Sequence, residues 1–199
     1  MPLAIIEESL IVSNEISPGV SSWTLASRAA HMLREAEKMY GKRQTNILFC
    51  GIEFQGKVPH IWYPGGDNAV IRLTPNCMQD IDRAYFQLSV EIAHLLTPVP
   101  GLEVNNLEEG MTVYFGERYC ADNGLRFLGI GDARYVQARE AFGKLMKISD
   151  NIIIEARNIR NTISRITPDD LETSIKKINA GATIDRNLLN FLCDKFPSK

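Results

Sequence analysis

Two neighbouring stretches decide how this chain is interpreted: SVEIAHLL at residues 89–96 and NNLEEGMTVYF at residues 105–115. The first belongs to a segment whose apolar residues recur at steps of three and four, the spacing of an amphipathic helix. These residues are Ile81, Tyr85, Leu88, Ile92 and Leu95. The helix is expected to end at Thr97, because the following Pro98 disfavours a helical conformation for the residue before it.

The second stretch is expected to begin another helix, which starts near Asn105 or Asn106 and runs to about residue 122. An asparagine followed three residues later by a glutamate is typical of a capped helix start. The chain offers this pattern twice, as Asn105 with Glu108 and as Asn106 with Glu109. One glutamate can take part in the cap while the other faces a site. The sequence leaves open whether Glu108 or Glu109 faces the site.

The spacing within the first stretch points to a particular chemistry. Positions i and i+4 of a helix lie on one face, about 5 to 6 Å apart. Zinc peptidases use this spacing in the motif H-E-x-x-H, where two histidines hold the metal and the glutamate activates water. This chain has V-E-x-x-H: Glu91 and His94 are in place, and Val90 stands at the position of the first histidine.

Together with the Glu-Glu-Gly of residues 108–110, the V-E-x-x-H stretch resembles the minimal gluzincin-type zinc metallopeptidases. In that family the third zinc ligand is a glutamate on the next helix, often followed directly by a glycine. The resemblance covers roughly residues 47–119. It implies His94 and Glu109 as metal ligands and Glu91 as the catalytic general base. It implies no role for Val90, which has no lone pair to donate.

A site that lacks one ligand is expected to hold metal poorly. Even the loss of a group that only orients a ligand costs about 10- to 100-fold in metal affinity or activity. We therefore expect no resident cofactor, and zinc only if another residue replaces the missing ligand. The other histidines, His31 and His60, show no ligand spacing. Tyr119 or Tyr135 could stand where peptidases place an oxyanion donor, and the sequence does not choose between them.

The same residues also have structural explanations. His94 could be an ordinary hydrogen-bonded histidine, and Glu91 an ordinary helix carboxylate or its ion-pair partner three residues away. Gly110, in the second turn of its predicted helix, costs about 1 kcal/mol relative to alanine. Close packing against another backbone would explain this glycine, and so would a later helix start.

Upstream of the motif, a helix is predicted from Ser21 or Ser22 to Tyr40, where Gly41 ends it. Three β-strands are predicted next, at residues 46–54, 58–63 and 69–73. A turn at residues 55–57 is expected to make the first two strands partners, and the resemblance makes 69–73 an edge strand. The sheet is therefore expected to be small and mostly antiparallel.

Downstream, helices are predicted at roughly residues 132–148, 151–163, 168–179 and 184–196. The fold class is thus α+β, with an N-terminal helix, a small three-stranded sheet and a helical C-terminal half. We expect one structural domain: a flexible segment at 1–20, a zincin-like core at 21–130, and a helical extension packed on it at 131–199. One side of a predicted helix carries Arg157, Arg160, Asn161 and Arg165, and this side is expected to face solvent.

The composition indicates which classes of protein this chain can belong to. The 199 residues are 45% hydrophobic and 23% charged, which is typical of a globular fold. The formal net charge of −2 is spread along the chain and indicates no nucleic-acid partner. No apolar stretch approaches the roughly 20 residues of a membrane helix. Four scattered cysteines without a C-x-x-C pair favour reduced thiols and a cytoplasmic location.

Three functional hypotheses follow. The first is a metallopeptidase-like pseudoenzyme with a degenerate zinc site, which binds a peptide or a protein partner in a groove beside the edge strand. The second is an active zinc-dependent peptidase with a non-standard ligand set. The third is a helical protein-interaction scaffold unrelated to peptidases. The sequence leaves enzymatic activity and the oligomeric state open.

Overall fold

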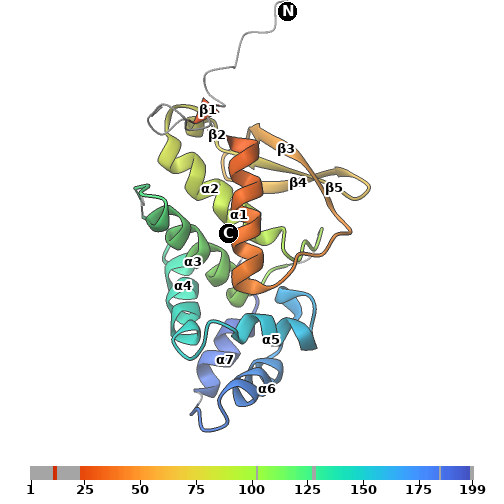
Figure 1. Cartoon of the computed structure of the whole chain (residues 1–199), viewed down its shortest axis with the longest axis vertical. Coiled ribbons are helices and arrows are strands. Elements are labelled where there is room, and N and C mark those ends of the chain that lie inside the picture. Colours follow the sequence, from red (N-terminus) through yellow and green to blue (C-terminus); the bar gives the residue numbers. More distant parts are fainter. Residues whose placement is uncertain (1–10, 13–22, 102, 127–128, 184, 198–199) are drawn as a thin grey trace, which may run out of the picture.

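The computed structural model describes residues 11–12, 23–101, 103–126, 129–183 and 185–197. The chain has the expected α+β class, with a helix, a small sheet and a helical C-terminal half (Figure 1). The strands are β1 (Ile11–Val12), β2 (Trp23–Thr24), β3 (Leu48–Phe54), β4 (His60–Gly65) and β5 (Asn68–Leu73). The helices are α1 (Leu25–Tyr40), α2 (Ile81–His94), α3 (Asn106–Asp122), α4 (Ala133–Met146), α5 (Ile152–Ile159), α6 (Pro168–Ile178) and α7 (Arg186–Cys193), with short 3-10 turns at Pro75–Gln79 and Ile163–Arg165.

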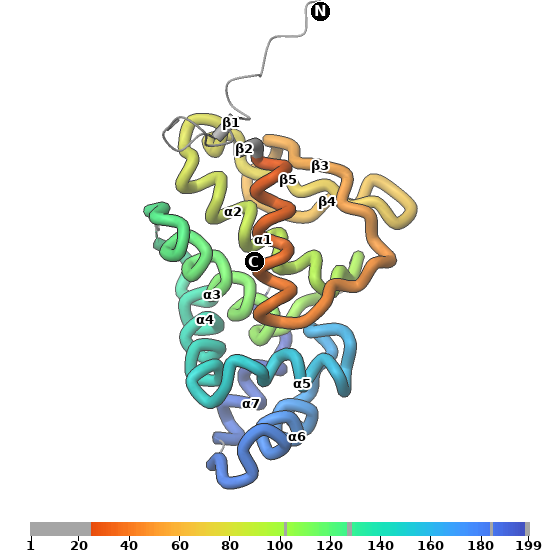
Figure 2. The backbone as a smooth tube through the Cα atoms, viewed as in Figure 1, coloured from red at the N-terminus to blue at the C-terminus, as the bar shows by residue number. Residues whose placement is uncertain are grey.

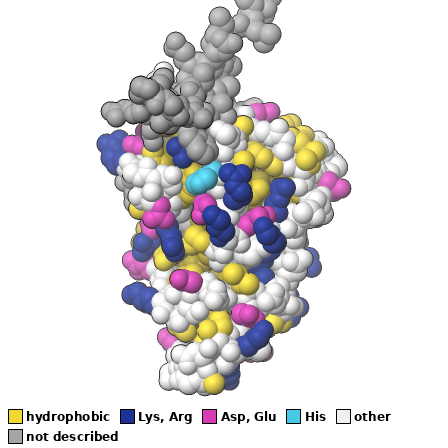
Figure 3. All heavy atoms as spheres, viewed as in Figure 1, with side chains coloured by type: hydrophobic (Ala, Val, Ile, Leu, Met, Phe, Trp, Pro, Cys, Tyr) yellow, Lys and Arg dark blue, Asp and Glu magenta, His cyan; other side chains and the backbone are white. Residues whose placement is uncertain are grey.

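The segment 1–20, expected to be flexible, lies outside the described residues except for Ile11–Val12. These two residues pair antiparallel with Trp23–Thr24 directly before α1. Among the described residues, no helix is both long and apolar enough to cross a membrane. On the face that carries α1, basic and acidic side chains are interspersed (Figure 3).

The strand order of the main sheet is β3-β5-β4, with β3 parallel and β4 antiparallel to β5. Three predictions were therefore wrong. The sheet is mixed, with one parallel and one antiparallel pair of strands, and is not mostly antiparallel. The segment 58–63 is not the partner of β3, and the segment 69–73 is the centre of the sheet and not its edge. β5 takes the centre because Ala69, Val70 and Ile71 are all buried, as in a strand covered on both faces. β4 lies at an edge and contains Pro64, a residue that sheets accept mainly at edges.

Helix α2 is the central element of the core. It packs against α1, α3 and β5, and places Tyr85, Leu88 and Ile92 in full burial. One continuous cluster of buried apolar side chains extends from Leu25 on α1 to Leu192 on α7. Figures 1 and 2 show α5, α6 and α7 grouped at the end of the molecule opposite β1 and β2. The described helices therefore share one hydrophobic core.

Two glycines let α3 approach its neighbouring helices closely. A Cβ atom added to Gly110 would lie 2.3 Å from the carbonyl oxygen of Ala138 on α4. A Cβ atom added to Gly116 would lie 3.1 Å from side-chain atoms of Phe86, Ser89 and Val90 on α2. Because α3 already begins at residue 106, close packing and not a late helix start explains Gly110. These contacts let α3 pack closely against α4 on one side and α2 on another.

Arg157 departs from the predicted solvated face. Its side chain is only 8% exposed, and its guanidinium donates hydrogen bonds to the backbone carbonyls of Tyr40, Gly41 and Lys42. The last carbonyls of a helix have no hydrogen-bond partner inside the helix. Arg157 of α5 is buried against the end of α1 and donates hydrogen bonds to the carbonyls there. Arg160 remains exposed and pairs with Asp170.

Candidate functional site

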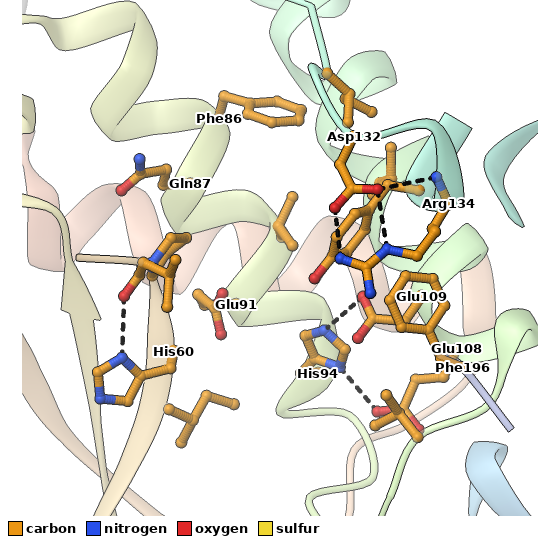
Figure 4. A pocket seen from close by; sticks show the side chains of 18 of the residues that line it. His60, Phe86, Gln87, Glu91, His94, Glu108, Glu109, Asp132, Arg134 and Phe196 are labelled. Carbon is orange, nitrogen blue, oxygen red and sulfur yellow. Dashed lines mark hydrogen bonds and ion pairs between the residues drawn. The ribbon is translucent and has the colours of Figure 1, made fainter. Parts of the chain in front are cut away.

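The end of α2 and the start of α3 bring the candidate metal-site residues together. His94, the last residue of α2, lies between Glu108 and Glu109 in the first turn of α3 (Figure 4). Its Nδ1 atom is 2.8 Å from Oε1 of Glu108, and its Nε2 atom is 3.7 Å from Oε2 of Glu109. The structure therefore joins His94 to both glutamates between which the sequence did not choose.

Glu108 is the more firmly held of the two glutamates. Its backbone N–H donates to the side chain of Asn105, which is the N-cap of α3. Its carboxylate accepts hydrogen bonds from His94 and from the hydroxyl of Ser164 in the turn after α5. The capping pair is thus Asn105 with Glu108, but the Glu108 side chain is committed to His94. Sequence reasoning did not single out Ser164, which lies 56 residues from Glu108.

The charge state of His94 follows from these contacts. Burial lowers the pKa of His94, but Glu108 and Glu109 raise it by more, so that it stands well above its ordinary value of 6.5. At neutral pH His94 is therefore an imidazolium cation between two carboxylates. In this state neither ring nitrogen has a lone pair free for a metal ion.

Glu91 occupies a different environment on the same helix. Its side chain is only 7% exposed, and among the described residues it has no hydrogen-bond or ion-pair partner. Burial raises the pKa of Glu91 from 4.5 to about 7, with Glu109 adding to the rise and His94 opposing it. A carboxyl with this pKa is suited to proton transfer near neutral pH, and it is also suited to pairing with a cation.

These side chains line a pocket of about 600 Å³, called here the β4 pocket. One wall is the edge strand β4 and the residues just before it, including Val58, Ile61 and Tyr63. A second wall is α2, with Phe86, Gln87, Val90, Glu91 and His94, and none of the described lining residues comes from β3. The remaining lining residues are Pro59, His60, Pro98, Val99, Gly101, Val104, Glu108, Glu109, Val113, Ile130, Gly131, Asp132, Arg134, Tyr135, Phe196 and Pro197.

Apart from Tyr135, the far wall of the β4 pocket was not predicted from the sequence. Asp132 caps the N-terminus of α4, and its carboxylate pairs with the guanidinium of Arg134 at 2.6 Å (Figure 4). Phe196 near the C-terminus packs against Tyr135, with ring centroids 4.7 Å apart. The only local signal was the cap residue Asp132 before an expected helix, and that signal predicts a helix start and not a site.

The other candidate residues separate into two groups. Tyr135 and His60 line the β4 pocket. Tyr119 does not, because its hydroxyl is 2.8 Å from Nδ1 of His31 on α1. Of the two tyrosines considered as oxyanion donors, only Tyr135 is therefore in position to meet a molecule in the pocket.

The donor set does not fit a catalytic zinc ion of the usual kind. Such a site needs three protein ligands, with Zn–N and Zn–O bonds of about 2.0 to 2.2 Å. The 3.7 Å between His94 and Glu109 has room for an ion bound to both. Val90 offers only carbon where the next ligand belongs, however, and among the described residues no three His, Cys, Asp or Glu side chains are grouped to hold a metal.

Comparisons with known proteins assign no family to this chain. No family model matches the sequence, and neither the curated proteins nor the solved structures contain a significantly similar chain.

Proposed function

We propose that this protein binds an extended peptide, or an extended segment of a partner protein, in the β4 pocket without hydrolysing it. The observation that supports this proposal best is the position of β4. It is an edge strand, and it forms one wall of a pocket of about 600 Å³ in which apolar side chains such as Val58, Phe86 and Val113 predominate.

An edge strand has backbone N–H and C=O groups that no neighbouring strand uses. A peptide in extended conformation can pair with these groups, while its alternate side chains enter the adjacent pocket. The other edge strand, β3, contributes no described residue to the pocket. Strand addition is therefore proposed at β4, with Val58, which is 51% exposed, as an apolar contact at the start of the wall.

Binding without hydrolysis is favoured by the chemistry of the site. His94 pairs with Glu108 and Glu109, and Val90 supplies no metal ligand. The set of ligands that would hold a water-activating metal is therefore incomplete. We propose on this basis a zincin-like pseudoenzyme. We also propose action in the cytoplasm, which is supported by the free thiols of Cys50, Cys77, Cys120 and Cys193.

The test uses the whole chain and an array of N-acetylated, C-amidated octapeptides, with binders measured by fluorescence anisotropy. Binders are then resynthesised with an N-methyl group on each backbone nitrogen in turn. In strand addition, N–H groups on one side of the peptide face β4. Methylation at alternate residues should abolish binding, and methylation at the residues between them should be tolerated. Mass spectrometry should recover every peptide intact.

Two variants provide a matched control. Val58→Ser removes an exposed apolar side chain beside the pocket and should weaken binding several-fold, because buried apolar area is lost. Leu48→Ser removes an apolar side chain of β3 that is 64% exposed, more than Val58, and should leave binding unchanged. The proposal fails if no octapeptide binds, or if N-methylation is tolerated everywhere. Peptide cleavage that a chelator abolishes would instead support the active zinc peptidase.

A further inference from the structure

Glu91 is a buried carboxyl that the fold itself leaves without a partner. It lies in the third turn of α2, is 7% exposed and lines the β4 pocket. In Figure 4 its carboxyl points away from α2 toward the β4 side of the pocket. Burying a charged group is costly unless a counter-charge or hydrogen bonds compensate it. Among the described residues the Glu91 carboxyl has no hydrogen-bond or ion-pair partner, and the charge of His94 offsets only part of the effect of burial.

The other acids that line the pocket are already paired. Glu108 accepts hydrogen bonds from His94 and Ser164, and Glu109 faces the second nitrogen of the same imidazolium. Asp132 is paired with Arg134 and also accepts from the backbone N–H of that residue. His94 and Arg134 thus both pair with other carboxylates, and no cation among the described residues forms an ion pair with Glu91.

The acids of the pocket also affect two tyrosines that line it, Tyr63 and Tyr135. Burial, Glu108 and Glu91 raise the pKa of Tyr63 on β4 to about 12. Burial, Glu109 and Glu91 raise the pKa of Tyr135 on α4 to about 12. Burial is the largest cause of both shifts and the nearby carboxylates add to it, so both phenols stay protonated. The acids Glu91, Glu108, Glu109 and Asp132 line the pocket together with His94 and Arg134, so a cation that enters it meets more negative than positive groups.

The surroundings also suit the stem of a long basic side chain. Phe86, Val90 and Tyr63 line the same pocket as Glu91 and contribute apolar surface to it. Lysine and arginine can bury their methylene groups against such a surface while the charged head reaches a polar partner. We propose that the β4 pocket selects peptides carrying a lysine or arginine, whose cationic head pairs with Glu91. This inference rests on the proposed peptide binding and specifies the class of peptide.

The experiment compares two probes that differ by the terminal ammonium group, built on the best-binding octapeptide, N-acetylated and C-amidated. One carries lysine and the other norleucine, moved through each position in turn, and affinities are measured at pH 8. The wild-type chain should bind the lysine peptide about 10- to 100-fold more tightly at one position, as expected for a hydrogen bond to a charged group. In Glu91→Gln this preference should fall to within about threefold, and the affinity for the norleucine peptide should not fall.

Three further measurements make the result specific. Glu91→Asp keeps the charge and should retain part of the preference for lysine. Glu140→Gln, an equal loss of charge at an exposed position of α4 outside the pocket lining, should retain all of it. A norleucine peptide with a free N-terminus tests whether a terminal ammonium is the preferred cation. If only this terminal amine raises affinity, the basic side chain is not the group selected.

The outcomes separate the two proposals. If peptides bind β4 but lysine and norleucine bind equally, the role of Glu91 is wrong and peptide binding stands. A preference for lysine that survives in Glu91→Gln would also overturn the role of Glu91. If no octapeptide binds at all, both proposals are wrong.

Discussion

The unpartnered carboxyl of Glu91 makes a quantitative prediction about stability. Its pKa is about 7 in the folded protein against 4.5 as the ordinary value, mainly because of burial. The folded state therefore holds a proton that the unfolded state releases between pH 4.5 and pH 7. Since the folded state binds more protons in this window, its free energy of unfolding falls as the pH rises through it.

The magnitude follows from the difference between the two pKa values. At about 1.4 kcal/mol per pKa unit, keeping Glu91 ionised in the folded state costs about 3 kcal/mol above pH 7. Most of this cost, about 2 to 3 kcal/mol, develops between pH 5 and pH 8. Glutamine has nearly the same shape and no charge, so Glu91→Gln removes the pH-dependent cost.

The assay is urea denaturation at pH 5 and pH 8 for the parent chain, Glu91→Gln and the exposed control Glu140→Gln. The free energy of unfolding of Glu91→Gln relative to the parent should rise by about 2 to 3 kcal/mol between the two pH values. The control should change by well under 1 kcal/mol. Equal differences at pH 5 and pH 8 would refute a buried, uncompensated carboxyl at position 91.

Two other substitutions test the remaining parts of the argument. Val90→His restores the i, i+4 pair with His94, and should tighten zinc binding about 10- to 100-fold or more in a competition titration with a chelator; unchanged affinity would show that α2 and α3 retain no metal-site geometry. Gly110→Ala places a Cβ atom 2.3 Å from the carbonyl oxygen of Ala138, and should lower the free energy of unfolding by about 1 to 3 kcal/mol or more. Gly143→Ala on α4 meets nothing closer than 3.8 Å and should be neutral or stabilising by up to about 1 kcal/mol, so equal losses in both variants would contradict the close α3–α4 contact.

The helices were predictable because their signals are local. The apolar spacing and the N-cap asparagine placed α3 within one residue of its observed start at Asn106, and its end at Asp122 was also predicted. For α6, the predicted start at residue 168 is confirmed, and the structure shows a capping box there between Thr167 and Asp170. These signals depend on residues three or four apart, and such residues are neighbours in any helix.

The sheet was only partly predictable. The three strand segments were recognised, but their pairing was wrong, because a strand pattern shows which side chains are buried and not which strand lies alongside. The uninterrupted apolar run Ala69–Ile71 and the presence of Pro64 were the available sequence signals for a central β5 and an edge β4. Arg157 was misplaced for a similar reason, since its partners at the end of α1 lie more than 110 residues away.

By itself, the sequence determined the helices, the α+β class and the chemistry present at positions 91, 94, 108 and 109, because these depend on residue type and short spacing. Only the tertiary structure decided that both glutamates flank His94, that Glu91 is left without a partner, and that residues 130–135 and Phe196 close the pocket against β4. The physical reason is that pairing and burial depend on distances in space. Packing between segments tens of residues apart sets these distances, and no local pattern encodes them.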